Sequence, residues 1–220
     1  MILSTEQTVH RNLLPAQLYE HAVRRHEGMI AAGGPFCAVT TPHTGRSAND
    51  KFLVREPDSS GRIWWGRVNQ PLAPEHFERL RTDVLAHLRD QELFVRDVFA
   101  GADPAHRVSV RFVTPNAWHA LFVYNMFLRP GPEDLAEFTP GFQVLHAPAF
   151  EADPAVHGTR SATFIVVSFA ERTILIGGTR YAGELKKSIF SVLNYLMPLQ
   201  GVLSMHCSAN VGPDGDSALF

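Results

Sequence analysis

Apolar positions recur along this 220-residue chain with spacings that predict a mixture of helices and strands. Apolar side chains three or four residues apart line one face of a helix, and a glycine just beyond such a pattern commonly ends it. Gly33-Gly34 follows the first of these patterns, and Pro74 is well placed as the first residue of the second. The helices expected from this spacing cover residues 18–30, 74–88, 116–126 and 183–197.

Short apolar runs bounded by turn residues predict the strands. The expected strands are residues 36–40, 93–99, 108–113, 142–146, 164–169 and 173–176. The first should be buried and should lead into a loop at 41–47, while 56–73 and 131–140 are expected to be ordered surface loops. The pattern therefore predicts an α/β (α+β mixed) fold with a mixed sheet and flanking helices. Turn residues at 198–201 predict a domain boundary, which divides the chain into 1–200 and 201–220.

Composition and charge narrow the class of protein. An apolar content of 45% with 19% charged residues is typical of a soluble folded protein. The formal net charge of −2 and the absence of a long basic run argue against nucleic-acid binding. The most apolar runs, 120–128 and 164–170, are about half of the roughly 20 residues that a membrane span needs. With no signal-peptide pattern and only Cys37 and Cys207, we expect a cytoplasmic protein that binds neither nucleic acid nor membrane.

The run Gly177–Lys187 carries the strongest indication of chemistry. Its glycines precede a helix, so backbone N–H groups and the positive end of the helix dipole are open to an anion. Lys186 and Lys187 add two cations where the dipole disfavours them, which an anionic ligand between them would explain. A neighbouring cation, partial burial or a metal would each favour a neutral lysine amine, and a neutral amine can bind a metal. The run therefore predicts an anion site that could also hold a metal.

Three further residues are candidates for the same site, and each has a plainer interpretation. Arg46 lies in the expected loop after the first strand, where its guanidinium could bind a carboxylate through two hydrogen bonds or could simply be exposed. His206 is a possible metal ligand, or a hydrogen-bonded histidine of the core. Tyr181 could face the site or pack in the core. The lysine pair itself could be an ordinary exposed pair. On local rules alone, these alternatives stay open.

Several segments taken together resemble ATP-dependent phosphoenolpyruvate carboxykinase, over about residues 12–220. They occur in the family's order and spacing, which makes the combination far more specific than any one motif. The segments that carry the resemblance are Thr44–Phe52, Ile63–Gly66, Val110–Thr114, Asn125–Pro130, Ile176–Lys187 and Met205–Gly212. The family converts oxaloacetate and ATP to phosphoenolpyruvate, CO₂ and ADP in gluconeogenesis, with Mn²⁺ on the protein and Mg²⁺ on ATP. The resemblance also implies that the intact enzyme is a monomer.

The resemblance implies a role for each candidate residue. Arg46 would be catalytic and would bind the substrate carboxylate, and Tyr181 would line the same pocket. Lys187 would be catalytic, a Mn²⁺ ligand, and in contact with both substrate and the γ-phosphate of ATP. Lys186 would be its catalytic cationic neighbour, lowering the Lys187 pKa and neutralising phosphoryl charge. His206 would be the second Mn²⁺ ligand and would lie against the ATP phosphate.

One part of the family pattern does not occur in these 220 residues. In the family, the segment that corresponds to 215–220 runs directly into a glycine-rich P-loop ending in Gly-Lys-Thr, followed by a metal-binding aspartate and a substrate arginine. We therefore expect 1–200 to be a substrate domain and 201–220 to be the start of a truncated nucleotide domain with an edge prone to association. The chain alone should be inactive. The alternatives are a stand-alone carboxylate-binding or interaction module, and a generic α/β domain whose lysines are surface residues.

Overall fold

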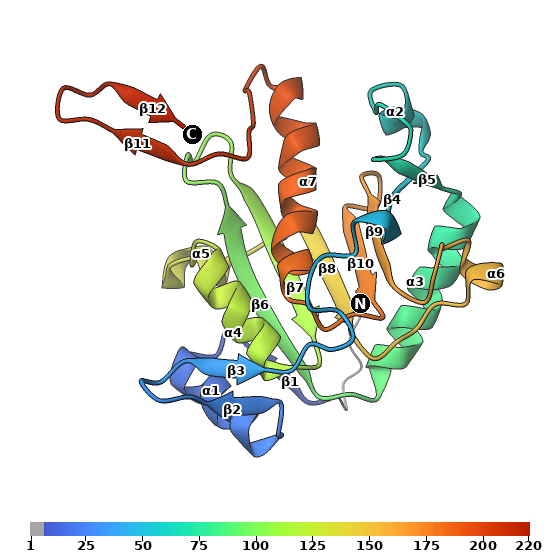
Figure 1. Ribbon diagram of the computed structural model, residues 1–220, viewed down its shortest axis with the longest axis vertical. Helices are drawn as coiled ribbons and strands as arrows, with labels where there is room; N and C mark the ends of the chain where they lie inside the picture. Colours follow the sequence, from blue (N-terminus) through green and yellow to red (C-terminus); the bar gives the residue numbers. More distant parts are fainter. Residues whose placement is uncertain (1–6) are drawn as a thin grey trace.

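The structure, a computed structural model, describes residues 7–220 and is built around one mixed sheet. The strands of this sheet are β1 (Val9–Arg11), β4 (Lys51–Val54), β5 (Gln70–Leu72), β6 (Leu93–Ala100), β7 (Val108–Thr114), β8 (Phe142–Ala147), β9 (Phe164–Ser168) and β10 (Thr173–Gly177). Their order across the sheet is β1-β6-β7-β8-β10-β9-β4-β5 (Figure 1). Only the β6–β7 and β9–β10 pairs of this sheet are antiparallel. The fold is therefore mixed α and β, as the sequence predicts.

Helices cover both faces of the sheet. They are α1 (Pro15–Arg24), α2 (Pro57–Ser60), α3 (Pro74–Arg89), α4 (Ala117–Met126), α5 (Pro132–Ala136), α6 (Pro154–His157) and α7 (Gly183–Leu199). The apolar side of α3 packs on one face, through residues such as Phe77 and Leu80. On the other face, Leu185 and Ile189 of α7 and Val123 of α4 pack against the sheet. Figure 1 shows α7 and α4 in front of the strands. The sheet therefore presents its strand ends, rather than its faces, to ligands.

The predicted core elements are confirmed. The five expected strands from 93 to 176 correspond to β6, β7, β8, β9 and β10, with ends that differ by one residue. β9 and β10 are buried along their whole length, because strands covered on both faces need apolar side chains at every position. The helix expected from Pro74 is α3, and the helix expected at 116–126 is α4.

The first predicted helix is wrong in its second half. α1 ends at Arg24, and Gly28–Ile30 forms a strand, β2, that pairs with β3 (Phe36–Ala38). Gly33 and Gly34 have φ values of 86° and 100°, so they make a hairpin turn and do not end a helix. β3 has no buried residue, since Cys37 is exposed and its two neighbours are half-buried, so the expectation of a buried strand is wrong. The apolar positions before and after the break are six residues apart, which does not match a continuous helical face.

The two expected surface loops contain short regular elements. Residues 56–73 include α2 and β5, and residues 131–140 include α5. Both helices begin at a proline, which fits the first helical position, but they are too short to show a periodic pattern. β4, with only four residues, was not predicted as a strand. Finally, α7 continues through Pro198 to Leu199, because a proline in the last turn removes only one backbone hydrogen bond.

The last twenty residues lie apart from the sheet. β11 (Ala209–Val211) and β12 (Ser217–Leu219) form an antiparallel hairpin whose residues are exposed throughout. Figure 1 shows this hairpin projecting away from the helices and the main sheet. The division at residue 200 stays a prediction. Among the helices of residues 7–220, none combines the length and the apolar character that a membrane crossing requires.

Candidate functional site

The glycine-rich run forms a tight turn between the end of β10 and the start of α7. Gly178 has a φ of 64°, and a Cβ atom built there would lie 2.5 Å from the carbonyl oxygen of Ala162. A Cβ atom on Gly183 would lie 2.5 Å from the ring of Tyr181. Only glycine tolerates both close approaches. The run therefore packs the aromatic ring of Tyr181 against the first residue of the helix.

Two buried histidines support this turn from inside the protein. The rings of His119 and His146 lie edge to face with their centres 4.4 Å apart. His119 Nε2 lies 2.9 Å from the carbonyl oxygen of Arg180, and His146 Nε2 lies 3.2 Å from that of Thr179. Burial lowers the pKa of His146 to about 4 and that of His119 well below its ordinary value. Both rings are therefore neutral at pH 7 and can donate to the carbonyl oxygens of the turn.

A buried carboxylate ties the Arg46 loop to the same turn. Glu184, the second residue of α7, is 2% exposed, and its Oε1 accepts a 2.7 Å hydrogen bond from the backbone N–H of Ser47. Its Oε2 lies 3.7 Å from Nε of Arg46. A carboxylate is favourable at a helix N-terminus, so Glu184 is stabilised by the dipole as well as by these contacts. The Arg46 side chain remains 39% exposed, which leaves part of its guanidinium free for a ligand.

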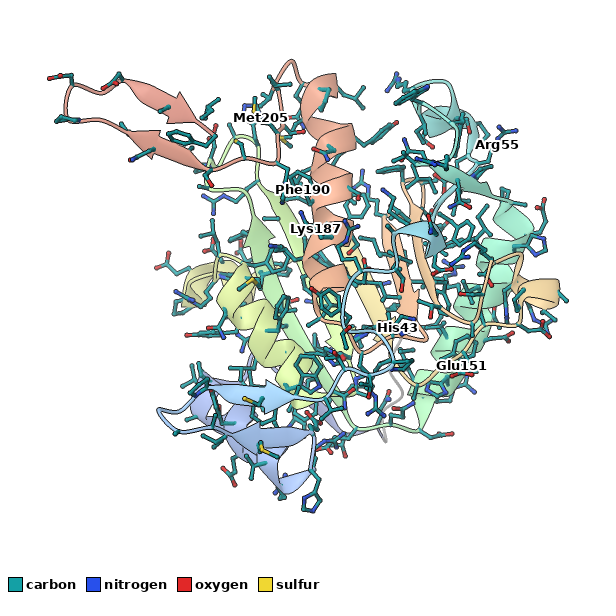
Figure 2. The ribbon with its side chains drawn as sticks, viewed as in Figure 1. His43, Arg55, Glu151, Lys187, Phe190 and Met205 are labelled. Atoms are coloured by element: carbon teal, nitrogen blue, oxygen red, sulfur yellow. The ribbon has the colours of Figure 1, made fainter. Side chains whose placement is uncertain are left out.

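Further contacts hold the two sides of this loop. His43 Nε2 lies 3.3 Å from Oγ1 of Thr163, whose hydroxyl also donates to the carbonyl oxygen of Gly178. After the loop, Asp50 is buried and accepts two hydrogen bonds from Arg160, at 3.1 and 3.2 Å. Figure 2 labels His43 within the segment that crosses in front of the sheet. These contacts hold the backbone of the loop that carries Arg46.

Lys187 and His206 are in direct contact, as a shared metal site would require. Lys187 Nζ and His206 Nε2 are hydrogen-bond partners, although 19 residues separate them in the sequence. The ring of Phe190 lies beside both, 5.0 Å from Lys187 Nζ and 5.3 Å from the His206 ring. Figure 2 shows Lys187 and Phe190 on α7, with Met205 in the segment that returns past the helix. His206 is exposed, so the alternative of a core histidine is wrong.

The two lysines differ in their surroundings. Partial burial, followed by the charges of Lys186 and Arg46, lowers the pKa of the Lys187 ammonium. Lys186 is exposed and lines a different cavity of about 550 Å³, together with Phe190 and Arg129. The charge of Lys186 thus lowers the Lys187 pKa, while the Lys186 side chain itself lines the separate cavity beside Phe190. Of the five candidate residues, Arg46, Lys187 and His206 gather at one place, with Tyr181 at the adjoining turn.

Lys51 is a further cation of the site that the sequence analysis missed. Its Nζ lies 3.4 Å from Oγ of Ser191, one helical turn beyond Lys187 on α7. Burial and the charge of Arg46 lower its pKa, and Glu184 opposes this effect. Lys51 also lines a cavity of about 370 Å³ beside Trp64. The sequence did offer a signal for Lys51, because this lysine begins an apolar run that directly follows the Arg46 loop. Arg46 and Lys51 lie near the Glu184 carboxylate, and the charge of Arg46 also acts on Lys187, so cations outnumber carboxylates here and the site attracts anions.

Removing the Glu184 carboxylate should loosen the Arg46 loop. In a Glu184→Ala variant, the Ser47 N–H and the Arg46 guanidinium lose their partner, so we expect about 1–3 kcal/mol of destabilisation. Hydrogen exchange measured by mass spectrometry should be faster over residues 44–50. Glu75→Ala is a matched control, because Glu75 is the second residue of α3 but is exposed. Equal exchange over 44–50 in both variants would show that the Glu184 contacts do not order the loop.

A turn with cations around it lies between a buried strand and a long helix, an arrangement that suits the binding of an anionic ligand. The family model for phosphoenolpyruvate carboxykinase matches residues 7–220. The chain therefore belongs to the phosphoenolpyruvate carboxykinase family, and similar curated proteins place it in the ATP-dependent branch. The resemblance read from the motifs is confirmed.

Relatives from three bacteria illustrate how far the similarity extends. Each carries the name phosphoenolpyruvate carboxykinase (ATP). The protein of Thermus thermophilus is 53% identical over 219 residues, which is 98% of this chain and 41% of the relative. That of Geobacillus thermodenitrificans is 53% identical over 220 residues, 100% of this chain and 42% of the relative. That of Novosphingobium aromaticivorans is 51% identical over 210 residues, which is 95% of this chain and 39% of the relative. The chain thus spans about two fifths of the length of these relatives.

Proposed function

We propose that this chain forms the carboxylate- and metal-binding part of an ATP-dependent phosphoenolpyruvate carboxykinase. The reaction would convert oxaloacetate and ATP to phosphoenolpyruvate, CO₂ and ADP. The observation that carries the proposal is the contact between Lys187 and His206 in a site that also holds Arg46. An ordinary surface lysine pair would not account for this convergence.

Arg46 would bind the substrate carboxylate. Its guanidinium can donate two parallel hydrogen bonds to a carboxylate, and it stays charged throughout the working pH range. Glu184 and the anchored loop would hold the guanidinium in one position. Tyr181, packed against Gly183, would form the neighbouring wall. Decarboxylation leaves an enolate, and Arg46 and the lysines would stabilise its negative charge.

The donor atoms of Lys187 and His206 fit a divalent metal ion. Their nitrogens lie side by side, so an ion that replaces the hydrogen bond between them can bind both lone pairs when the lysine is neutral. The lowered Lys187 pKa favours that state. We assign the ion as Mn²⁺, which when bound would polarise the enolate oxygen. Two protein ligands leave room for substrate, water and further ligands. Mg²⁺ would accompany ATP.

Lys187 and His206 would also contact the γ-phosphate of ATP, and Lys186 would add a positive charge nearby. The enolate oxygen would attack the γ-phosphorus and ADP would leave, a step that depends on positioning and charge neutralisation. A large part of the relatives' length has no counterpart in these 220 residues. The chain alone is therefore proposed to bind ligands without turning them over.

A fusion enzyme tests the proposal. It consists of this chain followed by the part of the Thermus thermophilus relative that lies outside the matched segment. We expect it to form phosphoenolpyruvate from oxaloacetate with ATP and Mn²⁺. An Arg46→Lys variant should raise KM for oxaloacetate by about tenfold or more, since an ammonium cannot make the paired hydrogen bonds. Arg67→Lys, at an exposed position, is the control and should leave KM unchanged.

Two results would contradict this assignment. If the fusion enzyme is active and Arg46→Lys behaves like Arg67→Lys, Arg46 does not bind the substrate. If the folded fusion binds phosphoenolpyruvate but shows no ATP-dependent turnover, the chain is better described as a carboxylate-binding module. Calorimetric titration with phosphoenolpyruvate separates these cases.

A further inference from the structure

A second group of potential metal ligands lies where α1 meets the edge of the sheet, on the face opposite α3. His10 belongs to β1, His21 to α1, and Glu92 directly precedes β6. One donor atom from each lies within 4.8 Å of the other two. We propose that these three residues bind a zinc-type divalent transition-metal ion, at a site that shares no residue with the Lys187–His206 pair.

The donor geometry requires only small adjustments to hold such an ion. His10 Nε2 lies 2.6 Å from Oε1 of Glu92, and His21 Nδ1 lies 3.8 Å from the same oxygen. Ligands of a tetrahedral zinc ion, about 2.0–2.1 Å from the metal, are roughly 3.3 Å apart. The two histidine–carboxylate separations differ from this value by about 0.7 and 0.5 Å, and the two histidine donors lie within 4.8 Å of each other. The side chains are partly buried, with 15 to 28% of their surface exposed, so a metal could enter from solvent.

Neighbouring residues hold the ligands in place. Both histidine rings pack on Phe94, with centres 5.0 and 5.2 Å from its ring. Arg25 contacts Oε2 of Glu92, which leaves Oε1 directed at the histidines. Arg25 is itself fixed by a 2.8 Å hydrogen bond to Glu27. Such surrounding contacts orient metal ligands and strengthen binding.

One contact competes with the ion and provides a test. Nη2 of Arg24 lies 3.0 Å from Nδ1 of His21. A guanidinium can only donate, so the lone pair of His21 Nδ1 accepts this hydrogen bond from Arg24 and becomes available to an ion when Arg24 moves away. Arg24 is exposed on α1, so the movement requires no rearrangement of the core.

The donor set selects the class of metal. Two imidazoles with one carboxylate suit zinc and related ions, whereas calcium and magnesium prefer oxygen ligands alone. Water would complete the coordination. Because the ligands come from the edge strand β1, from α1 and from the start of β6, the bound ion would fasten the first helix to the sheet.

Titration of the 220-residue chain with Co²⁺ and Zn²⁺ tests the site. In a His206→Gln background, which removes the other histidine donor, we expect one Co²⁺ per chain with the visible absorption of a tetrahedral ion, displaced by Zn²⁺. His21→Gln and Glu92→Gln should each weaken Zn²⁺ binding by at least about 10–100-fold, the loss that removing a mere supporting contact of a metal ligand already causes. His106→Gln is the control, since its Nε2 also lies near a carboxylate, 3.9 Å from Asp103, but without a second imidazole.

Arg24→Ala keeps the test decisive if the ligand variants fail to fold. Removing the competing guanidinium at an exposed position should tighten Zn²⁺ binding and increase the rise in Tm that Zn²⁺ produces. The proposal would be overturned by the absence of saturable binding, by unchanged affinity in folded His21→Gln, or by equal or weaker binding in Arg24→Ala.

Discussion

Lys187→Gln is expected to reduce kcat of the fusion enzyme by about 10²–10³-fold, the usual effect of removing one group that stabilises transition-state charge. Lys187 contacts His206 and lies within the influence of Arg46, so it occupies the centre of the proposed metal site. Lys186→Gln should reduce kcat much less, by about tenfold, because Lys186 is exposed and acts only through its charge. The measurement is ATP- and Mn²⁺-dependent formation of phosphoenolpyruvate.

A third variant tests whether Lys187 acts as a metal ligand or only as a positive charge. Arginine cannot lose its proton in a protein, so Lys187→Arg keeps the charge but cannot bind the ion. We expect Lys187→Arg to be as inactive as Lys187→Gln and to show weaker Mn²⁺ binding by electron paramagnetic resonance. Substantial activity in Lys187→Arg would mean that Lys187 supplies only charge. Unchanged Mn²⁺ affinity in both Lys187 and His206 variants would remove the proposed metal site.

The contact between Lys187 and His206 agrees with distances that can be worked out from the sequence. From Lys187 to the end of α7 is twelve residues, or ~18 Å of helix at about 1.5 Å per residue. The six residues from Gly201 to His206 span ~20 Å if extended at about 3.3 Å per residue. A chain that turns back at the glycine can therefore bring His206 beside Lys187. The buried strands and long helices were predictable for a similar reason, since their patterns are local.

Other parts of the site depend on contacts that no local pattern records. In the sequence, Glu184 is indistinguishable from an ordinary acidic residue in the first turn of a helix. Only the folded structure shows that its carboxylate accepts a hydrogen bond from the Ser47 backbone N–H. Lys51 becomes part of the site because β4 adds to the sheet beside β9. His119 looks like one apolar-face residue of α4 until the fold places it under the turn. These residues join the site through tertiary packing.

Acidification from pH 6.5 to about 4 is expected to destabilise the domain strongly. His119 and His146 are fully buried, and burial holds both pKa values below that of a histidine in the unfolded chain, to about 4 for His146. Above pH 6.5 both states carry neutral rings and stability is unaffected. As the pH falls below 6.5, the unfolded chain binds protons that the folded chain does not, so stability is lost until the folded pKa is reached.

The size of this effect is large compared with the stability of a domain. At about 1.4 kcal/mol per pH unit, the shift of His146 alone corresponds to roughly 3 kcal/mol, and His119 adds a loss in the same direction. Typical domains unfold with about 5–15 kcal/mol. Asp83 and Glu92 have lowered pKa values and therefore act in the same direction, but only as the pH approaches and falls below their ordinary values of 3.8 and 4.5. The interval above about pH 5.5 thus reports mainly on histidines.

Urea unfolding of the 220-residue chain at several pH values measures the effect. His119→Gln keeps an N–H donor for the Arg180 carbonyl but cannot titrate, so the slope of unfolding free energy against pH should fall by about 1.4 kcal/mol per pH unit. His26→Asn is the control: His26 is exposed with a φ of 54°, a conformation that asparagine tolerates. His21, whose pKa is also lowered, contributes equally to both variants. An unchanged slope in His119→Gln would mean that His119 is not held neutral. In that case the turn of Thr179 to Tyr181 would not depend on a neutral histidine pair.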